Sequence, residues 1–252
     1  MASAPKRQIV TFGGGGFSME AGNPLLDDFV LSLPGRDRPR VCFVPTASGD
    51  ADHYIVRFYR AFGSDRCEPS HLSLFRRHRT PFDPCEHLLS RDLIYVGGGS
   101  VASMLAVWRA HKVDRALREA WRRGVVLCGL SAGSLCWFRD GVSTFHGDPQ
   151  RVDGLGLLPW SNTVHHSSEP DRRDALHSWI LEGMPTAYAA DDGAALHFVG
   201  TDVAQVVASR PAARAYRIER RHGRVVTTQL GTRFLGDAEV VPLRRPGLVA
   251  EG

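Results

Sequence analysis

The chain has 252 residues, of which 43% are hydrophobic, and a formal net charge of +4 at pH 7. A chain of this length can bury a core without disulfides or metals, so we expect a single α/β domain over residues 1–252. No apolar run approaches the roughly 20 residues that span a bilayer, and the N-terminus lacks a signal-peptide pattern. We therefore expect a cytoplasmic protein with no membrane partner.

The distribution of charged residues and cysteines argues against further classes of protein. Basic residues are spread along the chain, and the densest stretch, residues 76–79, is short and has no interleaved aromatic side chains. We therefore expect no nucleic-acid partner. The five cysteines include no CxxC pair and mostly lie in apolar runs, which is typical of buried, reduced thiols. The His and Cys spacing matches no metal site, so we expect neither a metal nor another cofactor.

Four short apolar segments, each followed by a turn rich in glycine or small polar residues, predict parallel strands that are buried on both faces. They are Ile9–Phe12, Val41–Val44, Leu93–Val96 and Val125–Cys128. Helical patterns between them cover Asp52–Phe62, Ser103–His111 and Val113–Arg123. This alternation is typical of a three-layer, doubly wound, mostly parallel sheet, which binds ligands at the carboxyl ends of its strands.

The pattern changes after about residue 204, where three short segments predict a C-terminal antiparallel β extension. They are Gln205–Ala208, Ala215–Ile218 and Val225–Leu230, with a turn at residues 221–223. No internal repeat or linker separates them from the preceding residues, so they belong to the same predicted domain.

The segment Gly129-Leu130-Ser131-Ala132-Gly133 matches the G-x-S-x-G turn, which exposes a nucleophilic serine between a strand and a helix. We expect the helix to run from Ala132 to Phe138, with the Ala132 N–H as a first donor to an oxyanion. A serine that merely caps a helix is the structural alternative, and the preceding strand favours the nucleophile. Cys128 and Cys136 flank the turn in apolar runs, which is typical of core residues rather than reactive thiols.

A nucleophilic serine needs a general base and an acid that orients the base. Of the eleven histidines, His165 and His166 follow a short strand end and precede a loop, where a base can reach the serine from the same sheet edge. Asp191 and Asp192 follow another short apolar segment in the same way. One chain order compatible with these positions is Ser131, His165, Asp192.

Two other interpretations remain open at the level of residue spacing. The α/β-hydrolase order of nucleophile, acid and base would use Ser131, Asp191 or Asp192, and then His197 or His222. The glycine run at residues 13–16 could instead hold a nucleotide phosphate, although it lacks GxGxxG spacing and a following Lys-Ser/Thr pair.

The combination of motifs resembles the peptidase E family of serine peptidases, which includes aspartyl dipeptidase and the related cyanophycinases. The matching segments are Tyr95–Ser100, Gly129–Ser134, Val164–His165 with Ser168–Arg173 after it, and Ala190–Gly193. The resemblance implies a class I glutamine-amidotransferase-like, flavodoxin-like sheet and a triad in the order Ser, His, acid. It thus implies that Ser131 is the nucleophile, His165 the base and Asp192 the acid, with Gly99 as the second oxyanion donor beside Ala132.

Two departures from the family pattern bear on substrate choice. Aspartyl dipeptidases have a glutamate as third triad member, whereas this chain has an aspartate, which is one methylene shorter. An arginine downstream of their catalytic histidine receives the substrate's aspartyl side chain, and here Arg172 or Arg173 would take that role at a shorter spacing. An ordinary solvated helix start is the alternative interpretation of these arginines.

The expected function is hydrolysis of small peptides by a serine exopeptidase, with dipeptides that begin with aspartate among the candidate substrates. An esterase or other acyl hydrolase using Ser131, and a non-catalytic member of the fold that binds a small ligand, are the alternatives. A monomer and a homodimer are both compatible with the sequence.

Overall fold

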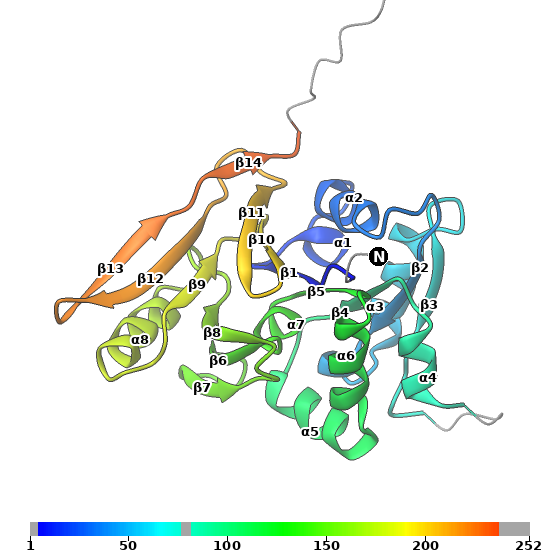
Figure 1. Cartoon of the computed structure of the whole chain (residues 1–252), viewed down its shortest axis with the longest axis horizontal. Helices are drawn as coiled ribbons and strands as arrows, with labels where there is room; N and C mark the ends of the chain where they lie inside the picture. Colours follow the sequence, from blue (N-terminus) through cyan, green and yellow to red (C-terminus); the bar gives the residue numbers. More distant parts are fainter. Residues whose placement is uncertain (1–4, 77–81, 237–252) are drawn as a thin grey trace, which may run out of the picture.

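The computed structural model describes residues 5–76 and 82–236, and its largest element is an eight-stranded sheet (Figure 1). Its parallel strands are, in spatial order, β3 (Glu68–His71), β2 (Arg40–Val44), β4 (Leu93–Val96), β5 (Val126–Leu130) and β1 (Gln8–Phe12). Beyond β1 follow β10 (Ala194–Val199), β11 (Asp202–Ala208) and β14 (Thr232–Phe234). Strand β10 runs antiparallel to both of its neighbours.

Consecutive residues of each strand point to opposite faces of this sheet, so both faces carry apolar side chains, and helices cover both. Ile9 and Ile94 pack into one apolar cluster, whereas Val10 and Tyr95 pack into the other. The helices of the first cluster are α4 (Pro84–Leu89), α5 (Val101–His111) and α6 (Val113–Arg122), next to a short 3-10 turn, η1 (Thr46–Ser48). Those of the second are α1 (Gly16–Met19), α2 (Leu25–Ser32) and α3 (Asp52–Ala61).

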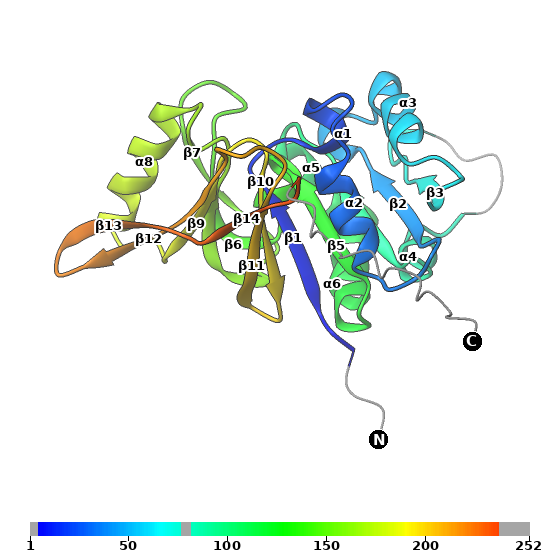
Figure 2. The same cartoon turned by 90° about the horizontal axis from the view of Figure 1, so that it is seen from above.

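A second sheet of six strands is built from later parts of the chain. Its spatial order is β13 (Arg224–Gln229), β12 (Ala215–Arg221), β9 (Ala187–Ala190), β8 (Leu158–Thr163), β6 (Phe138–Ser143) and β7 (Gln150–Asp153). Helix α8 (Pro170–Leu181) packs on it through Leu176 and Ile180, which cluster with Val142 and Ile218. Figures 1 and 2 both place this sheet and α8 on one side of the molecule and β2, β3 and α3 on the other.

Aromatic side chains pack between the two sheets. Phe198 on β10 of the first sheet lies edge-on to Phe138 on β6 and to Tyr188 on β9, with ring centroids 5.7 and 5.4 Å away. Such edge-to-face pairs contribute about 0.5–1.5 kcal/mol each beyond the burial of their area. Their packing joins β6 and β9 of the second sheet to β10 of the first.

The predicted strands and helices are present, with three corrections. The helix expected from Ala132 to Phe138 is a single turn, α7 (Ala132–Leu135), because Trp137 and Phe138 are fully buried and Phe138 begins β6. The expected mostly parallel sheet accounts for β1 to β5 only. The predicted C-terminal extension is divided, since β11 joins the first sheet whereas β12 and β13 join the second.

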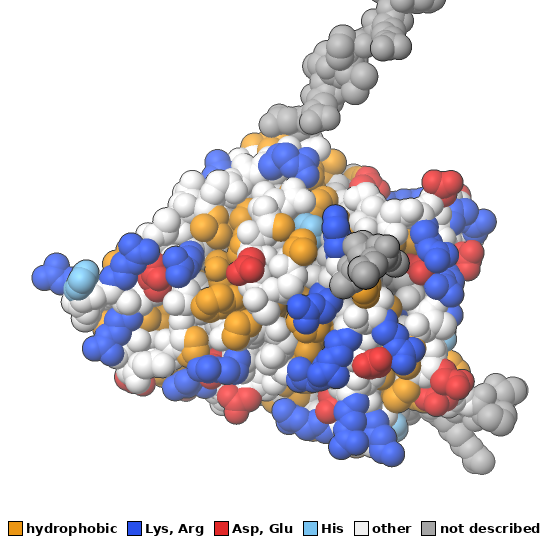
Figure 3. All heavy atoms as spheres, viewed as in Figure 1, with side chains coloured by type: hydrophobic (Ala, Val, Ile, Leu, Met, Phe, Trp, Pro, Cys, Tyr) orange, Lys and Arg blue, Asp and Glu red, His pale blue; other side chains and the backbone are white. Residues whose placement is uncertain are grey.

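The surface matches the even spread of basic residues along the chain. On the face seen in Figure 3, Lys and Arg side chains lie over both sheets, with Asp and Glu side chains among them. Residues 77–79 of the basic stretch lie outside the described residues. Within the described ranges, no helix combines the length and the apolar character needed to cross a membrane.

One carboxyl group lies inside the second apolar cluster, near the carboxyl end of β1. Asp27 of α2 is 2% exposed, and a Cβ on Gly16 would lie 3.0 Å from its Oδ1. Burial raises the pKa of Asp27 to about 7, although a hydrogen bond from the Phe17 backbone and the charge of Arg66 act in the opposite direction. The folded protein therefore holds this proton more tightly than the unfolded chain does.

We predict that Asp27→Asn removes a pH dependence of stability. With a pKa of 3.8 unfolded and about 7 folded, Asp27 makes its full contribution to stability below pH 4 and loses it as the pH rises to about 7. The loss is on the order of 4 kcal/mol. Thermal unfolding at pH 5 and pH 8 should therefore show Asp27→Asn gaining stability relative to wild type at the higher pH. The exposed neighbour Asp28, changed to Asn, is the control. Parallel shifts in Asp27→Asn and wild type would contradict the prediction.

Candidate active site

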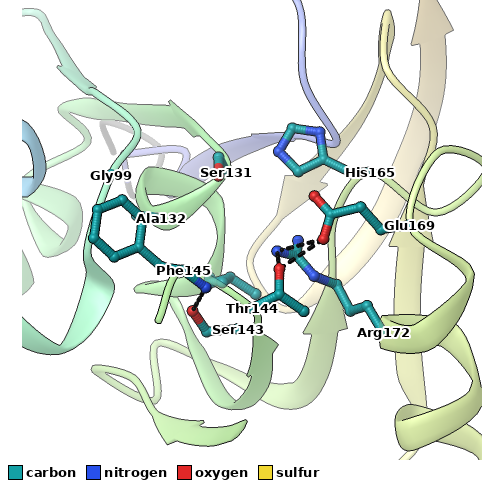
Figure 4. A pocket seen from close by; sticks show the side chains of 10 residues that line it. Gly99, Ser131, Ala132, Ser143, Thr144, Phe145, His165, Glu169 and Arg172 are labelled. Carbon is teal, nitrogen blue, oxygen red and sulfur yellow. Dashed lines mark hydrogen bonds and ion pairs between the residues drawn. The ribbon is translucent and has the colours of Figure 1, made fainter. Parts of the chain in front are cut away.

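Ser131 lies in the turn between β5 and α7, where the first sheet presents the carboxyl ends of its strands. Its φ and ψ are 52° and −115°, a conformation that costs a non-glycine residue about 1–3 kcal/mol. The side chain lines a cavity of about 370 Å³, and Figure 4 shows it on the same side of that cavity as the side chain of His165. A strained, partly exposed serine in a strand-to-helix turn is the geometry expected of a nucleophile.

The two glycines of the turn are needed because backbone segments approach each other closely. A Cβ on Gly129 would lie 2.4 Å from the carbonyl oxygen of Gly133. A Cβ on Gly133 would in turn lie 2.3 Å from the carbonyl oxygen of Val96 at the end of β4. Any side chain at either position would therefore push α7 away from the sheet and move Ser131.

His165 and Asp192 come from the second sheet, two residues beyond the ends of β8 and β9. Because β8 and β9 are parallel neighbours, their carboxyl ends lie side by side. The His165 Nδ1 lies 2.5 Å from Asp192 Oδ1, and the Ser168 hydroxyl donates to Asp192 Oδ2 at 3.1 Å. A carboxylate only accepts hydrogen bonds, so Nδ1 carries the proton and Nε2 is left free to accept one.

The electrostatics favour an ionised Asp192. Burial raises the pKa of its carboxyl, but the hydrogen bond and charge of His165, together with Ser168 and Arg210, outweigh burial and lower that pKa below its usual range. The carboxylate therefore remains charged at neutral pH, where it can orient an imidazole and stabilise its cation.

The backbone of Gly13 and Gly14, just after β1, passes between the two loops that carry His165 and Asp192. Gly13 O accepts from the His165 N–H at 3.2 Å, and Gly14 O accepts from the Gly193 N–H at 3.0 Å. A Cβ on Gly14 would lie 2.0 Å from Asp192 Oδ1 and 3.0 Å from His165 Cε1. The glycine run considered above as a phosphate loop therefore packs against the His–Asp pair.

The neighbouring His166 and Asp191 point elsewhere. The His166 ring is buried against Tyr216, with centroids 4.7 Å apart, and its backbone N–H donates to Ala190 O at 3.1 Å. Asp191 accepts from the Arg214 N–H at 3.0 Å and from the Tyr216 hydroxyl at 3.4 Å. Both residues thus serve the contact between β9 and β12 and do not line the cavity.

Neither histidine that the α/β-hydrolase order would use as base lines the cavity. The His197 ring lies within the first sheet, bonded to Gln8 at 3.0 Å and to Gln205 at 3.3 Å. His222 is in the turn between β12 and β13. Cys128 and Cys136 are fully buried, and burial raises the pKa of both thiols well above the usual value, so neither is a nucleophile.

The remaining cavity lining combines two backbone amides, apolar side chains and one ion pair. Gly99 and Ala132 line it beside Ser131, and no backbone hydrogen bond among the described residues uses either N–H. Leu135 and Phe145 supply apolar surface. Among the described residues, no group of three or more His, Cys, Asp or Glu side chains is placed to hold a metal ion.

Arg172 reaches the cavity, whereas Arg173 does not line it. The Arg172 side chain is 6% exposed, and its Nη2 lies 3.0 Å from Glu169 Oε2. Burial lowers the pKa of its guanidinium, an effect that the charge of Glu169 opposes. Arg173 instead lies 3.7 Å from Asp174. The sequence did not single out Glu169, although it lies within the Ser168–Arg173 segment that carried part of the resemblance.

Comparison with known proteins agrees with the geometry. The family model of peptidase family S51 matches residues 9–206. Bacillus subtilis (strain 168) has an uncharacterized peptidase, YgaJ, that is 45% identical over 231 residues, which are 91% of this chain and 100% of that protein. Peptidase E of Pasteurella multocida (strain Pm70) is 25% identical over 193 residues, 70% of this chain and 77% of that protein. A solved structure, a peptidase from an acI-B1 actinobacterium, has the same fold with a TM-score of 0.68 at 19% identity, covering 91% and 96% of the two chains.

We predict that Gly14→Ala disrupts the pairing of His165 with Asp192, because the new methyl group would occupy the position of the Asp192 carboxylate. The rate at which a fluorophosphonate reacts with Ser131 should fall by about 100-fold or more. Gly231→Ala is the matched control, since a Cβ there meets no atom within 4 Å and the backbone is not left-handed. An unchanged reaction rate in a folded Gly14→Ala protein would contradict this role of Gly14.

Proposed function

Because the chain belongs to peptidase family S51, we propose that it hydrolyses short peptides through an acyl-enzyme on Ser131. The observation that carries this proposal is the His165–Asp192 pair, whose histidine lines the same cavity as Ser131. His165 is the general base in this mechanism, and Asp192 orients it. Gly99 and Ala132 supply the oxyanion hole.

The reaction follows from these positions. Ser131 Oγ attacks the carbonyl carbon of the scissile bond while His165 Nε2 takes the hydroxyl proton, and Asp192 stabilises the resulting imidazolium. Collapse of the tetrahedral intermediate breaks the C–N bond, and His165 returns the proton to the leaving amine. Water then attacks the acyl-enzyme with His165 again as base, which releases the acid and restores the serine.

The oxyanion is stabilised by the two unused backbone amides. Gly99 and Ala132 line the cavity together with Ser131, and we assign their N–H groups to the oxygen that becomes charged. One donor of this kind stabilises a transition state by about 3–4 kcal/mol. Because these are backbone groups, they need no reorganisation when charge develops.

The cavity favours short substrates. Its volume of about 370 Å³ is at the lower end for small-molecule sites, and Figure 4 shows Phe145 on one side of it and the Glu169–Arg172 pair on the other. An acidic first side chain has one candidate partner in the cavity, Arg172. Because Arg172 is already paired with Glu169, the substrate carboxylate would compete with Glu169 for the guanidinium.

We predict that Ser131→Ala abolishes peptide hydrolysis, lowering kcat by at least about 10⁴-fold, and abolishes labelling by a fluorophosphonate probe. A dipeptide panel and short-chain esters should be assayed side by side. Ser178→Ala, on α8, is the control and should keep full activity. Labelling that persists in Ser131→Ala would overturn the assignment of the nucleophile, and hydrolysis of esters without peptides would favour the esterase alternative.

Selectivity for an N-terminal aspartate depends in this proposal on Arg172 and not on Arg173. We therefore expect Arg172→Ala to lower the kcat/KM ratio of Asp-X to Asn-X dipeptides toward one, and Arg173→Ala to leave that ratio unchanged. A charge-assisted hydrogen bond of this kind corresponds to about 10- to 100-fold in the ratio. A wild-type ratio near one, or an equal effect of both substitutions, would argue against aspartate selectivity through Arg172.

A further inference from the structure

We propose that Glu169 binds the α-ammonium group of the substrate's first residue, so that the enzyme cleaves the peptide bond that follows the N-terminal residue. The proposal rests on the function proposed above, because it concerns the same cavity. It names the carboxylate of Glu169 as the group that recognises the primary ammonium of a free N-terminus.

Exposure distinguishes the two charged groups of the cavity. The Glu169 side chain is 36% exposed, whereas that of Arg172 is 6% exposed. Glu169 Oε2 accepts from the Thr144 hydroxyl at 2.6 Å and pairs with Arg172 at 3.0 Å. Figure 4 shows the other carboxylate oxygen turned into the space below His165 and Ser131. A ligand in the cavity therefore meets a carboxylate oxygen before it meets a guanidinium.

Both terminal nitrogens of Arg172 have partners within the protein, so a substrate carboxylate would have to replace one of them. Its Nη1 donates to Val164 O at 3.1 Å, and its Nη2 bonds to the Thr144 hydroxyl and to Glu169. Its Nε is buried among described residues without a partner and so does not face the cavity. Arg172 thus holds one oxygen of Glu169 in place and leaves the other oxygen for a ligand.

Substrate geometry requires such a group to lie close to the nucleophile. In the residue that acylates Ser131, the α-nitrogen and the attacked carbonyl carbon are separated by one Cα, about 2.5 Å apart. The group that binds this nitrogen must therefore line the same cavity as Ser131. Among the described lining residues Glu169 is the one carboxylate, and its backbone N–H donates to His165 O at 2.9 Å, which ties it to the base.

A free amine and a lysine side chain offer the same chemistry, so the test must separate them. The substrates are the p-nitroanilides of alanine, N-acetylalanine and N-acetyllysine, assayed with wild type, Glu169→Gln and Glu182→Gln. Glutamine keeps the size of the side chain and an oxygen for Arg172 and Thr144 but removes the negative charge. Glu182, at the other end of α8, is the matched control.

We expect wild type and Glu182→Gln to prefer the alanine substrate over the N-acetylalanine substrate. In Glu169→Gln this ratio of kcat/KM should fall by about 10- to 100-fold, mainly through KM for the free amine. The wild-type kcat/KM for the alanine substrate should also decline above about pH 8, where an α-ammonium loses its proton, and that for N-acetylalanine should not.

Three outcomes would overturn the proposal. An equal ratio in wild type and Glu169→Gln would show that Glu169 does not bind the amine. Faster cleavage of N-acetyllysine than of N-acetylalanine, lost in Glu169→Gln, would assign Glu169 to a basic side chain instead. If wild type cleaves none of these substrates and Ser131 is not labelled by a fluorophosphonate, the proposed function itself fails, and the inference with it. Labelling of Ser131 in wild type separates this case from the first two.

Discussion

The site depends on a close contact between backbone and side chains at the carboxyl end of β1. Gly13 and Gly14 leave the first sheet and pass between the loops that follow β8 and β9, and they form hydrogen bonds to both loops. Because Gly14 has no side chain, the carboxylate of Asp192 and the ring of His165 can lie against its backbone. This close packing buries the Asp192 carboxylate and places it beside His165. A larger residue at position 14 would separate the two sheets where their reactive groups meet.

The charged side chains at the site differ in whether their partners lie within the protein. Asp192 is used by the histidine, with Ser168 supporting it, and so is not available to a ligand. Arg172 bonds to Val164 O in the loop that carries the histidine and to Thr144 just after β6. Glu169 is thereby left as the charged side chain of the cavity that is both oriented and accessible. Which charged side chain can bind a ligand is therefore determined by which of them already have partners within the protein.

The sequence predicted the parts of the site that are local. The turn around Ser131 is short, and its strand and glycines are contiguous, so its geometry could be inferred from the order of residues alone. His165 and Asp192 are 27 residues apart and meet because β8 and β9 pair, so spacing left two chain orders open and the family resemblance chose between them. The role of Glu169 depends on how Arg172 is bonded, which no sequence pattern shows.

The parallel strands of the first sheet could be predicted from the sequence more fully than the strands of the second, for a similar reason. The parallel strands β1, β2, β4 and β5 are continuous apolar runs, which identify buried strands. Much of the second sheet is less distinctive, because β7 is a polar, largely exposed strand and β9 is an alanine-rich segment of four residues. Such strands have low intrinsic preference for a sheet and form there because their neighbours supply partners.

The placement of the reactive groups on two sheets has a mechanical consequence. Ser131 follows β5 of the first sheet and His165 follows β8 of the second, whereas Asp192 lies between β9 of the second sheet and β10 of the first. A small rotation between the sheets would therefore change the distance between the Ser131 hydroxyl and the His165 ring. Phe198, packed against Phe138 and Tyr188, joins the two sheets and opposes that rotation, so an aromatic contact outside the cavity helps to hold Ser131 and His165 at a fixed separation.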